Sequence, residues 1–160
     1  MLFEFDSLAE QKANIKVIGV GGAGGNAVNR MIQDGMDGVD FLVINTDAQD
    51  LDNNSADNKL QIGKNLTKGL GAGAHSQIGQ EAIESDKDVV KTMIEDANMV
   101  FITAGMGGGT GTGAAPTVAQ IAREMGILTV GIVTLPFNFD GPKRMKRGVA
   151  GVDELRKACD

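Results

Sequence analysis

The chain is poor in the residues that metal centres, disulfides and base-stacking surfaces require. It has no tryptophan and no tyrosine, and its 160 residues include one histidine, His75, and one cysteine, Cys159. A single cysteine cannot form an intramolecular disulfide, and one histidine with one cysteine cannot build a metal cluster of the usual spacing. Six phenylalanines are the only aromatic residues, so platforms for stacking single-stranded bases are few. We therefore expect no metal site built by the protein alone.

Positive charge and long apolar runs are also scarce. The net charge is -6, from 21 acidic and 15 basic residues, a balance that argues against a nucleic-acid partner or an anionic membrane surface. No apolar run approaches the roughly 18 residues that can span a bilayer. Residues 1–12 lack the basic start and apolar stretch of a signal peptide. We expect a cytoplasmic protein without direct membrane insertion, in which residues 1–13 form a flexible N-terminal segment.

Glycine, in contrast, is abundant. The chain has 23 glycines in 160 residues, about twice the usual share of roughly 7%. They are not spread as in a flexible linker but gather in three segments, 19–25, 69–73 and 105–113. Each cluster therefore needs a local explanation.

Apolar runs and helical spacings alternate along the chain. Short runs rich in β-branched residues predict buried strands at 15–20, 39–45, 98–103 and 127–134. Helical spacing of apolar residues follows at 26–32, 114–125 and 145–155, and the looser stretch between them suggests a short strand at 59–62 and helices at 78–84 and 88–95. Strands that are apolar on both faces indicate a sheet covered on both sides. We predict an α/β fold: a Rossmann-like three-layer sandwich with a mostly parallel sheet and helices on both faces.

The first glycine segment directly follows a predicted strand. Gly19, Gly21 and Gly24 match the G-x-G-x-x-G pattern, in which glycines allow a tight turn and a close approach of the backbone to phosphate. An NAD-binding Rossmann domain would look the same here. That alternative requires an acidic residue at the end of the second strand, where this chain has Asn45, with Asp47 beyond it.

The second segment, 105–113, follows a strand and opens a helix that we place near Gly111. It is not a Walker A loop, because no lysine follows the glycines. Successive backbone N–H groups can form an anion-binding nest, and the helix N-terminus adds partial positive charge. Thr110 and Thr112 supply hydroxyl donors. This segment predicts a binding site for the phosphates of a nucleotide.

The run Gly107-Gly108-Gly109-Thr110-Gly111-Thr112-Gly113, together with residues 21–26, resembles the tubulin/FtsZ family of GTPases. Further stretches are similar to the bacterial cell-division branch of that family, namely 45–49 (NTDAQ), 69–74 (GLGAGA) and 136–141 (PFNFDG). The resemblance covers nearly all of residues 14–158. It implies a GTP-binding subdomain at 14–160, without the family's central helix and C-terminal subdomain. We expect that residue 160 is a cut inside a longer protein.

The resemblance also implies ligands and site residues. GTP or GDP would bind, with Mg²⁺ accompanying the triphosphate. Ala23 stands where the family usually has glycine, and Asp140 where glutamate is commoner, so its reach to the ribose hydroxyls would be shorter. The implied nucleotide-binding residues are Gly21, Gly22, Ala23, Gly24, Gly25, Asn26, Asn45, Ala72, Gly73, Gly105, Met106, Gly108, Gly109, Thr110, Gly111, Pro136, Asp140 and Arg144.

The same resemblance implies a polymer-forming GTPase at the division site in the cytoplasm. The full protein would associate with itself head-to-tail into the cytokinetic ring, contact other division-ring proteins, and hydrolyse GTP at the subunit interface. The acidic loop that activates water would lie beyond residue 160 and act from the neighbouring subunit, so no catalytic residue is assigned in this chain. The chain alone would bind nucleotide but be catalytically incomplete. The alternatives are a non-enzymatic half-module that caps filaments and the NAD-binding domain.

The remaining residues that invite a functional interpretation are expected to be ordinary. His75 is expected to be a solvated loop histidine, and Cys159 an inert thiol. Of the basic cluster after Gly141, Arg144 is assigned to the nucleotide. Lys143, Lys146 and Arg147 are expected to form a solvated helix face, with a contact to another subunit as the alternative.

Overall fold

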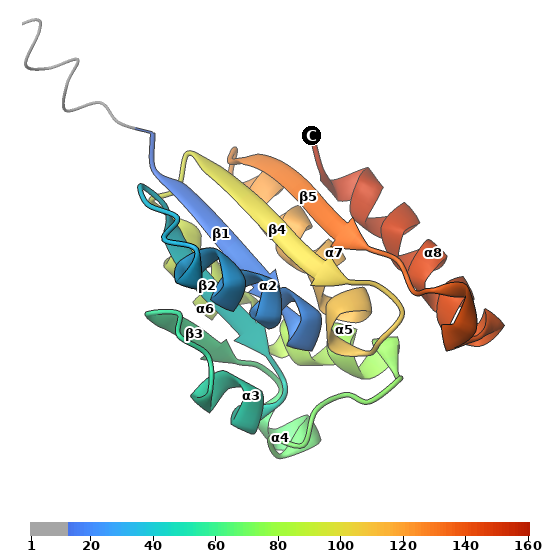
Figure 1. Ribbon diagram of the computed structural model, residues 1–160. Helices are drawn as coiled ribbons and strands as arrows, with labels where there is room; N and C mark the ends of the chain where they lie inside the picture. Colours follow the sequence, from blue (N-terminus) through green and yellow to red (C-terminus); the bar gives the residue numbers. More distant parts are fainter. Residues whose placement is uncertain (1–12) are drawn as a thin grey trace, which may run out of the picture.

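A computed structural model describes residues 13–160 of the chain. Its centre is a five-stranded sheet in the order β3-β2-β1-β4-β5, and each of its strand pairs is parallel (Figure 1). The strands are β1 (Ile15–Val20), β2 (Asp40–Asn45), β3 (Asn58–Gln61), β4 (Met99–Gly105) and β5 (Leu128–Thr134). The predicted α/β, Rossmann-like fold is confirmed. Most of the expected flexible segment, residues 1–12, lies outside the described residues.

Helices cover both faces of the sheet. The two on one face are α2 (Gly21–Gln33) and α3 (Ala48–Asp52), and α2 lies in front of the sheet in Figure 1. The other face carries α5 (Ser76–Ser85), α6 (Lys87–Ile94), α7 (Thr110–Glu124) and α8 (Pro142–Ala158). The connections contain the short helix α4 (Lys64–Thr67) and the 3₁₀ turn η1 (Asn138–Asp140). The result is the expected three-layer arrangement.

The core is divided by the sheet into two apolar clusters. Alternate side chains of a strand point to opposite faces, so Ile18 packs with Val118 of α7 in the larger cluster, while Val17 packs with Val28 of α2 in the smaller one. All four side chains are buried. The two helix layers are therefore held against the same central strands, which positions the N-termini of α2 and α7 relative to each other.

The strand order creates a switch point between β1 and β4. From β1 the chain proceeds outward through β2 and β3, whereas β4 and β5 extend the sheet in the opposite direction. In open parallel sheets, ligands bind outside the carboxyl ends of the strands at such a point. Helix α2 begins directly after β1, and α7 begins after a short loop that follows β4. The first turns of α2 and the loop before α7, residues 106–109, consist largely of glycine.

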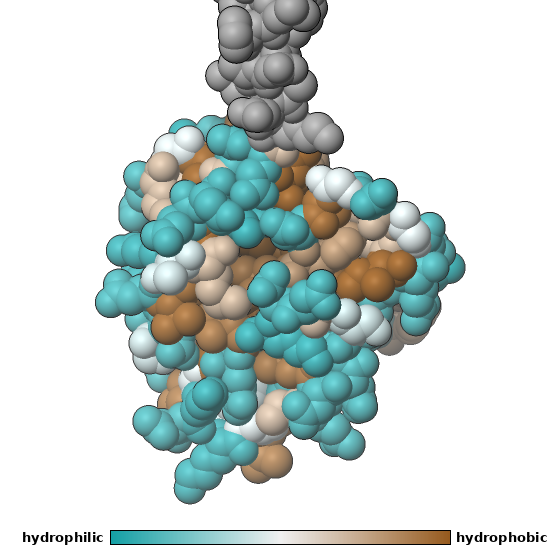
Figure 2. All heavy atoms as spheres, turned by 90° about the vertical axis from the view of Figure 1, so that its left-hand side faces the viewer, coloured by the Kyte–Doolittle hydropathy of each residue, from teal (hydrophilic) through white to brown (hydrophobic). Residues whose placement is uncertain are grey.

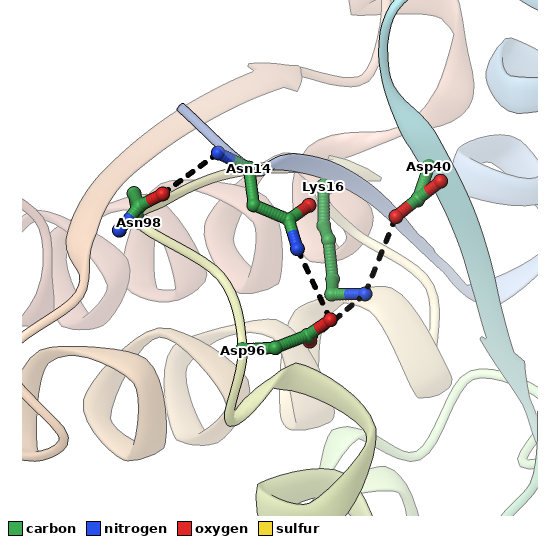
Figure 3. Close-up of polar contacts among 5 residues, drawn as sticks. All are labelled: Asn14, Lys16, Asp40, Asp96 and Asn98. Atoms are coloured by element: carbon green, nitrogen blue, oxygen red, sulfur yellow. Dashed lines mark hydrogen bonds and ion pairs between the residues drawn. The ribbon is translucent and has the colours of Figure 1, made fainter. Parts of the chain in front are cut away.

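The opposite end of the sheet is held together by a buried lysine (Figure 3). Lys16 is 8% exposed, and its Nζ lies 3.2 Å from Asp96 Oδ1 and 3.6 Å from Asp40 Oδ2. Asn14 donates from Nδ2 to Asp96 and from its backbone nitrogen to Asn98 Oδ1. The hydrogen bond from Lys16 is the main cause that lowers the pKa of the Asp96 carboxyl. This cluster joins the beginnings of β1, β2 and β4.

Exposed apolar side chains are concentrated on β5 and the segment after it. Leu128 and Ile132 of β5 are 49% and 58% exposed. Helix α2 covers β2, β1 and β4 but makes few contacts with this edge strand.

On the face shown in Figure 2, apolar areas are interrupted by hydrophilic residues. Among residues 13–160, no helix is both long and apolar enough to cross a membrane.

Candidate functional site

A cavity of about 470 Å³ opens at the carboxyl ends of the strands, above the switch point. It is formed by the segments that follow β1, β2, β4 and β5 and by residues 70–73. It brings together all the predicted site residues except Gly24, Gly25 and Asn26; those that line it are Gly21, Gly22, Ala23, Asn45, Ala72, Gly73, Gly105, Met106, Gly108, Gly109, Thr110, Gly111, Pro136, Asp140 and Arg144. The three glycine segments therefore meet at one site.

Two close contacts show how tightly these segments pack. A methyl group on Gly21 would lie 2.9 Å from the backbone nitrogen of Gly111, and Gly21 has a φ of 77°. A methyl group on Gly109 would lie 2.7 Å from the carbonyl oxygen of Gly73. Backbone thus packs directly on backbone between the segments, which only glycine permits at these positions.

The cavity receives the N-termini of two helices. The first four N–H groups of an α-helix have no partner within the helix, and neither Val20 before α2 nor Gly109 before α7 supplies a side-chain cap. Neither helix has an acidic residue in its first turn. The free N–H groups and the positive ends of both helix dipoles therefore meet at the cavity, which is an environment that binds anions.

The phosphate-type loop, residues 106–109 between β4 and α7, is held in place by two hydrogen bonds of Gly107. Its N–H group donates to Thr112 Oγ1 at 2.7 Å, and its φ is 114°, in the region that favours glycine. Its carbonyl oxygen accepts a hydrogen bond from Nε of Arg147 at 3.0 Å. The expectation that Arg147 belongs to a solvated helix face is therefore wrong: α8 packs against this loop, and Arg147 is partly buried there.

Asn45, the last residue of β2, and Thr46, which follows it, shape the floor of the cavity. The Oδ1 atom of Asn45 accepts hydrogen bonds from the backbone nitrogens of Thr46 and Asp47 at 2.8 and 3.2 Å. The hydroxyl of Thr46 lies 2.6 Å from that of Thr110 at the start of α7. Asn45 therefore stabilises a turn, and its carbonyl-type oxygen is already used by the backbone.

The segment after β5 forms the rim of the cavity. Asp140 lines the cavity and also accepts a hydrogen bond from the backbone nitrogen of Phe137 at 2.8 Å, through Oδ2. The rings of Phe137 and Phe139 are stacked with centroids 5.1 Å apart. Arg144, in the first turns of α8, lines the same side. One carboxylate and one guanidinium thus stand together at the end of the cavity nearest to β5.

Three predicted residues do not line the cavity. A methyl group on Gly24 would lie 2.5 Å from the carbonyl oxygen of Thr103, so this glycine allows α2 to pack closely on β4. Gly25 is buried, and its missing side chain leaves space for Asn54. Asn26 is exposed on α2. Contact of these residues with a nucleotide stays a prediction.

Sequence reasoning assigned no site role to two carboxylates in the cavity, Asp47 and Asp50. Asp47 precedes α3 and accepts a hydrogen bond from the backbone nitrogen of Asp50 at 3.1 Å. Aspartate before a helical turn is a recognised capping signal, and it could have revealed α3. Within residues 13–160, no group of three or more His, Cys, Asp or Glu side chains is placed to hold a metal ion.

Comparison with known proteins identifies the family of this chain and supports its fold. The GTPase domain of the tubulin/FtsZ family matches residues 14–160, and the chain belongs to this family. Within the family it matches the N-terminal part of FtsZ: it is 47% identical to FtsZ of M. jannaschii, solved as an empty dimer, with a TM-score of 0.94 over 99% of this chain and 46% of that one.

More distant relatives were solved with nucleotides. CetZ1 of Haloferax volcanii, a GDP-bound monomer, is 25% identical with a TM-score of 0.84, over 92% of this chain and 49% of that one. CetZ2 of the same organism, a GTPγS-bound protofilament, is 26% identical with a TM-score of 0.82, over 91% and 47%. The chain therefore spans less than half the length of each of these proteins.

Proposed function

We propose that this chain is the nucleotide-binding part of a tubulin-like cell-division GTPase and that its cavity binds GTP and GDP. One observation carries the proposal: the uncapped N-termini of α2 and α7 converge on one cavity at the switch point of the sheet. This arrangement suits a chain of phosphates. The GDP and GTPγS bound by the two CetZ relatives support guanine nucleotides as the ligands.

The cavity suggests a role for each part of its lining. Met106 and residues 108–111 would surround the α- and β-phosphates, with residues 21–23 on the other side. Ala72 and Gly73 would lie near the γ-phosphate and distinguish GTP from GDP. Asp140 and Arg144 would hold the ribose side, with Pro136 lining the pocket. These assignments follow the family resemblance and the cavity lining.

Magnesium would enter with the triphosphate. Mg²⁺ keeps several waters and is usually held by substrate phosphates and one or two carboxylates. The cavity offers Asp47 and Asp50 as carboxylates near its glycine loops, which fits this mode of binding and not a dedicated protein cage. When bound, the ion would neutralise phosphate charge.

We propose that hydrolysis requires a second subunit. Self-association is supported by the FtsZ dimer and the CetZ2 protofilament. The full protein would form head-to-tail filaments in the cytokinetic ring, which lies in the cytoplasm at the division site. Other division-ring proteins would be its partners. The acids that activate water would come from the neighbouring subunit. The 160-residue chain should then bind GTP but release almost no phosphate. Sustained phosphate release by this chain alone would contradict the proposal of catalytic incompleteness.

Calorimetric titration of the chain with GDP and with NADH tests the nucleotide assignment. We expect GDP to bind and NADH to give no heat of binding. Arg144→Ala should weaken GDP binding about tenfold, because a charged hydrogen-bond donor leaves the cavity. Lys143→Ala is the matched control, since Lys143 is exposed on the same helix and does not line the cavity. Binding of NADH but not GDP would overturn the assignment.

A further inference from the structure

Arg147 contacts the phosphate-type loop from outside the nucleotide cavity. It does not line the nucleotide cavity; it lies in a separate groove of about 630 Å³ between α5, α7 and α8. Its Nε donates to the carbonyl oxygen of Gly107 at 3.0 Å, and it forms no ion pair with any carboxylate among residues 13–160. Its one specific polar contact in the described part of the chain is therefore with the loop.

This hydrogen bond fixes the direction of a neighbouring N–H group. In a trans peptide unit, the carbonyl oxygen of one residue and the N–H of the next point in opposite directions. No cis peptide bond occurs in the described chain. Because the Gly107 carbonyl points to the Arg147 guanidinium, the N–H of Gly108 points away from that side chain. Gly108 itself lines the cavity, so an N–H with this direction is available to an anion bound there.

The peptide between Gly107 and Gly108 needs such a restraint. Gly107 packs against Pro136 and Arg144, but a methyl group on Gly108 would meet no atom within 4 Å, so packing holds the peptide plane on the Gly107 side only. Glycine adopts many backbone conformations at little cost. On the other side of Gly107, the bond to Thr112 Oγ1 fixes the preceding peptide. The bond from Arg147 supplies the second restraint.

Helix α8 is placed to make this restraint rigid. A methyl group on Gly148 would lie 2.8 Å from Pro136 Cδ, and one on Gly151 would lie 2.7 Å from Thr112 Cγ2. The helix backbone therefore lies directly against the residues that flank the loop. Arg147 extends from this closely packed surface, so its backbone is held at a fixed position relative to the loop.

We propose that Arg147 is a positioning residue for phosphate binding: it orients the Gly107–Gly108 peptide so that the Gly108 N–H faces the anion. This inference rests on the proposed function, because it concerns how the same cavity binds a nucleotide. A guanidinium on the carbonyl also polarises the peptide and makes its N–H a stronger donor. Arg147 thus acts through the loop and not by touching the ligand.

Two neutral variants separate the hydrogen bond from the charge. The amide nitrogen of glutamine stands as many bonds from the backbone as Nε of arginine, so Arg147→Gln keeps a donor and loses the charge. Arg147→Met loses both. In calorimetric titration with GDP, we expect Arg147→Met to bind about tenfold more weakly than the unmodified chain and Arg147→Gln to stay within about threefold. Lys146→Met, on an exposed position of the same helix, removes one charge and should change binding less than twofold.

Equal weakening by the Gln and Met variants would show that charge alone matters and would overturn the proposal. Unchanged GDP binding by Arg147→Met would overturn it as well, while leaving the proposed function intact. If the unmodified chain binds no GDP, the proposed function itself fails.

A ligand-free measurement tests the orientation without any nucleotide. The ¹H–¹⁵N signal of Gly108 should shift in Arg147→Met and stay near its original position in Arg147→Gln. If Arg147→Met does not fold, the Gln variant still decides: a displaced Gly108 signal in that folded variant contradicts the proposal.

Discussion

The hydroxyl oxygens of Thr46 and Thr110 lie 2.6 Å apart in the floor of the cavity. Thr46 is fully buried and Thr110 is 8% exposed. The pair connects Thr46, the residue after β2, to the first residue of α7, which follows β4; β2 and β4 are not neighbours in the sheet. The hydrogen bond therefore helps to hold the start of α7 at the floor of the cavity.

Thr110→Val should lower the free energy of unfolding by about 1–3 kcal/mol, because it leaves the buried Thr46 hydroxyl without its partner. Thr110→Ser keeps the hydroxyl and should cost less. Urea unfolding of both variants measures the difference. A Val variant as stable as the unmodified chain would show that the hydrogen bond between the two hydroxyls does not contribute to stability.

Gly21→Ala should destabilise the chain by more than Gly35→Ala. Both glycines have nearly the same positive φ, 77° and 78°, but a methyl group meets the Gly111 nitrogen at 2.9 Å in the first case and nothing within 4 Å in the second. The Gly35 variant therefore measures backbone strain alone, of about 1 kcal/mol. The excess loss at Gly21 reports the contact between the two loops. Thermal unfolding that places both variants at the same midpoint would contradict this interpretation.

Asp96→Asn should reduce stability at neutral pH but not at low pH. The bond from Lys16 lowers the folded-state pKa of Asp96 below its ordinary value of 3.8, so its contribution is present above that ordinary value. It is lost as the pH falls through the lower folded pKa. The Asp96 side chain is 63% exposed, so we expect a loss of about 1 kcal/mol at pH 7.

The measurement is urea unfolding of both proteins between pH 7 and pH 2. The two stability curves should stay apart down to about pH 4 and converge only as the pH falls further, through the lowered pKa of folded Asp96. Asp57→Asn serves as the control, because Asp57 is exposed and forms no ion pair among residues 13–160. A constant difference between the Asp96 variant and the original chain down to pH 2 would exclude the ion pair as its cause.

The fold could be predicted from sequence because buried parallel strands are nearly continuous apolar runs. The first strand was predicted at 15–20 and β1 is Ile15–Val20. The start of α2 was predicted less well: it begins at Gly21, not near Asn26. Glycine has low helix propensity, but the close packing of Gly24 on the carbonyl of Thr103 favours helix there. A tertiary contact overrides the local preference, and single-sequence patterns do not contain it.

The candidate site was likewise predictable only in part. Its backbone parts could be predicted, because glycines at strand-to-helix junctions indicate a loop that approaches a ligand. Its side-chain restraints were not. Thr46 and Thr110 are 64 residues apart in sequence, and Arg147 and Gly107 are 40 apart. Such pairs leave no periodic pattern, and Arg147 stands in a basic cluster whose composition indicates only a solvated surface.

The pairing of β1 with β4 also has a kinetic consequence. Ile15 pairs with Met99, and the neighbouring bond from Asn14 to Asn98 joins residues 84 positions apart. Closing so long a loop costs entropy before its contacts are gained, and such non-local pairing slows folding. During synthesis, β1 must therefore wait with one edge unpaired until β4 has left the ribosome. We therefore expect the cavity, whose lining includes residues that follow both strands, to form late in folding.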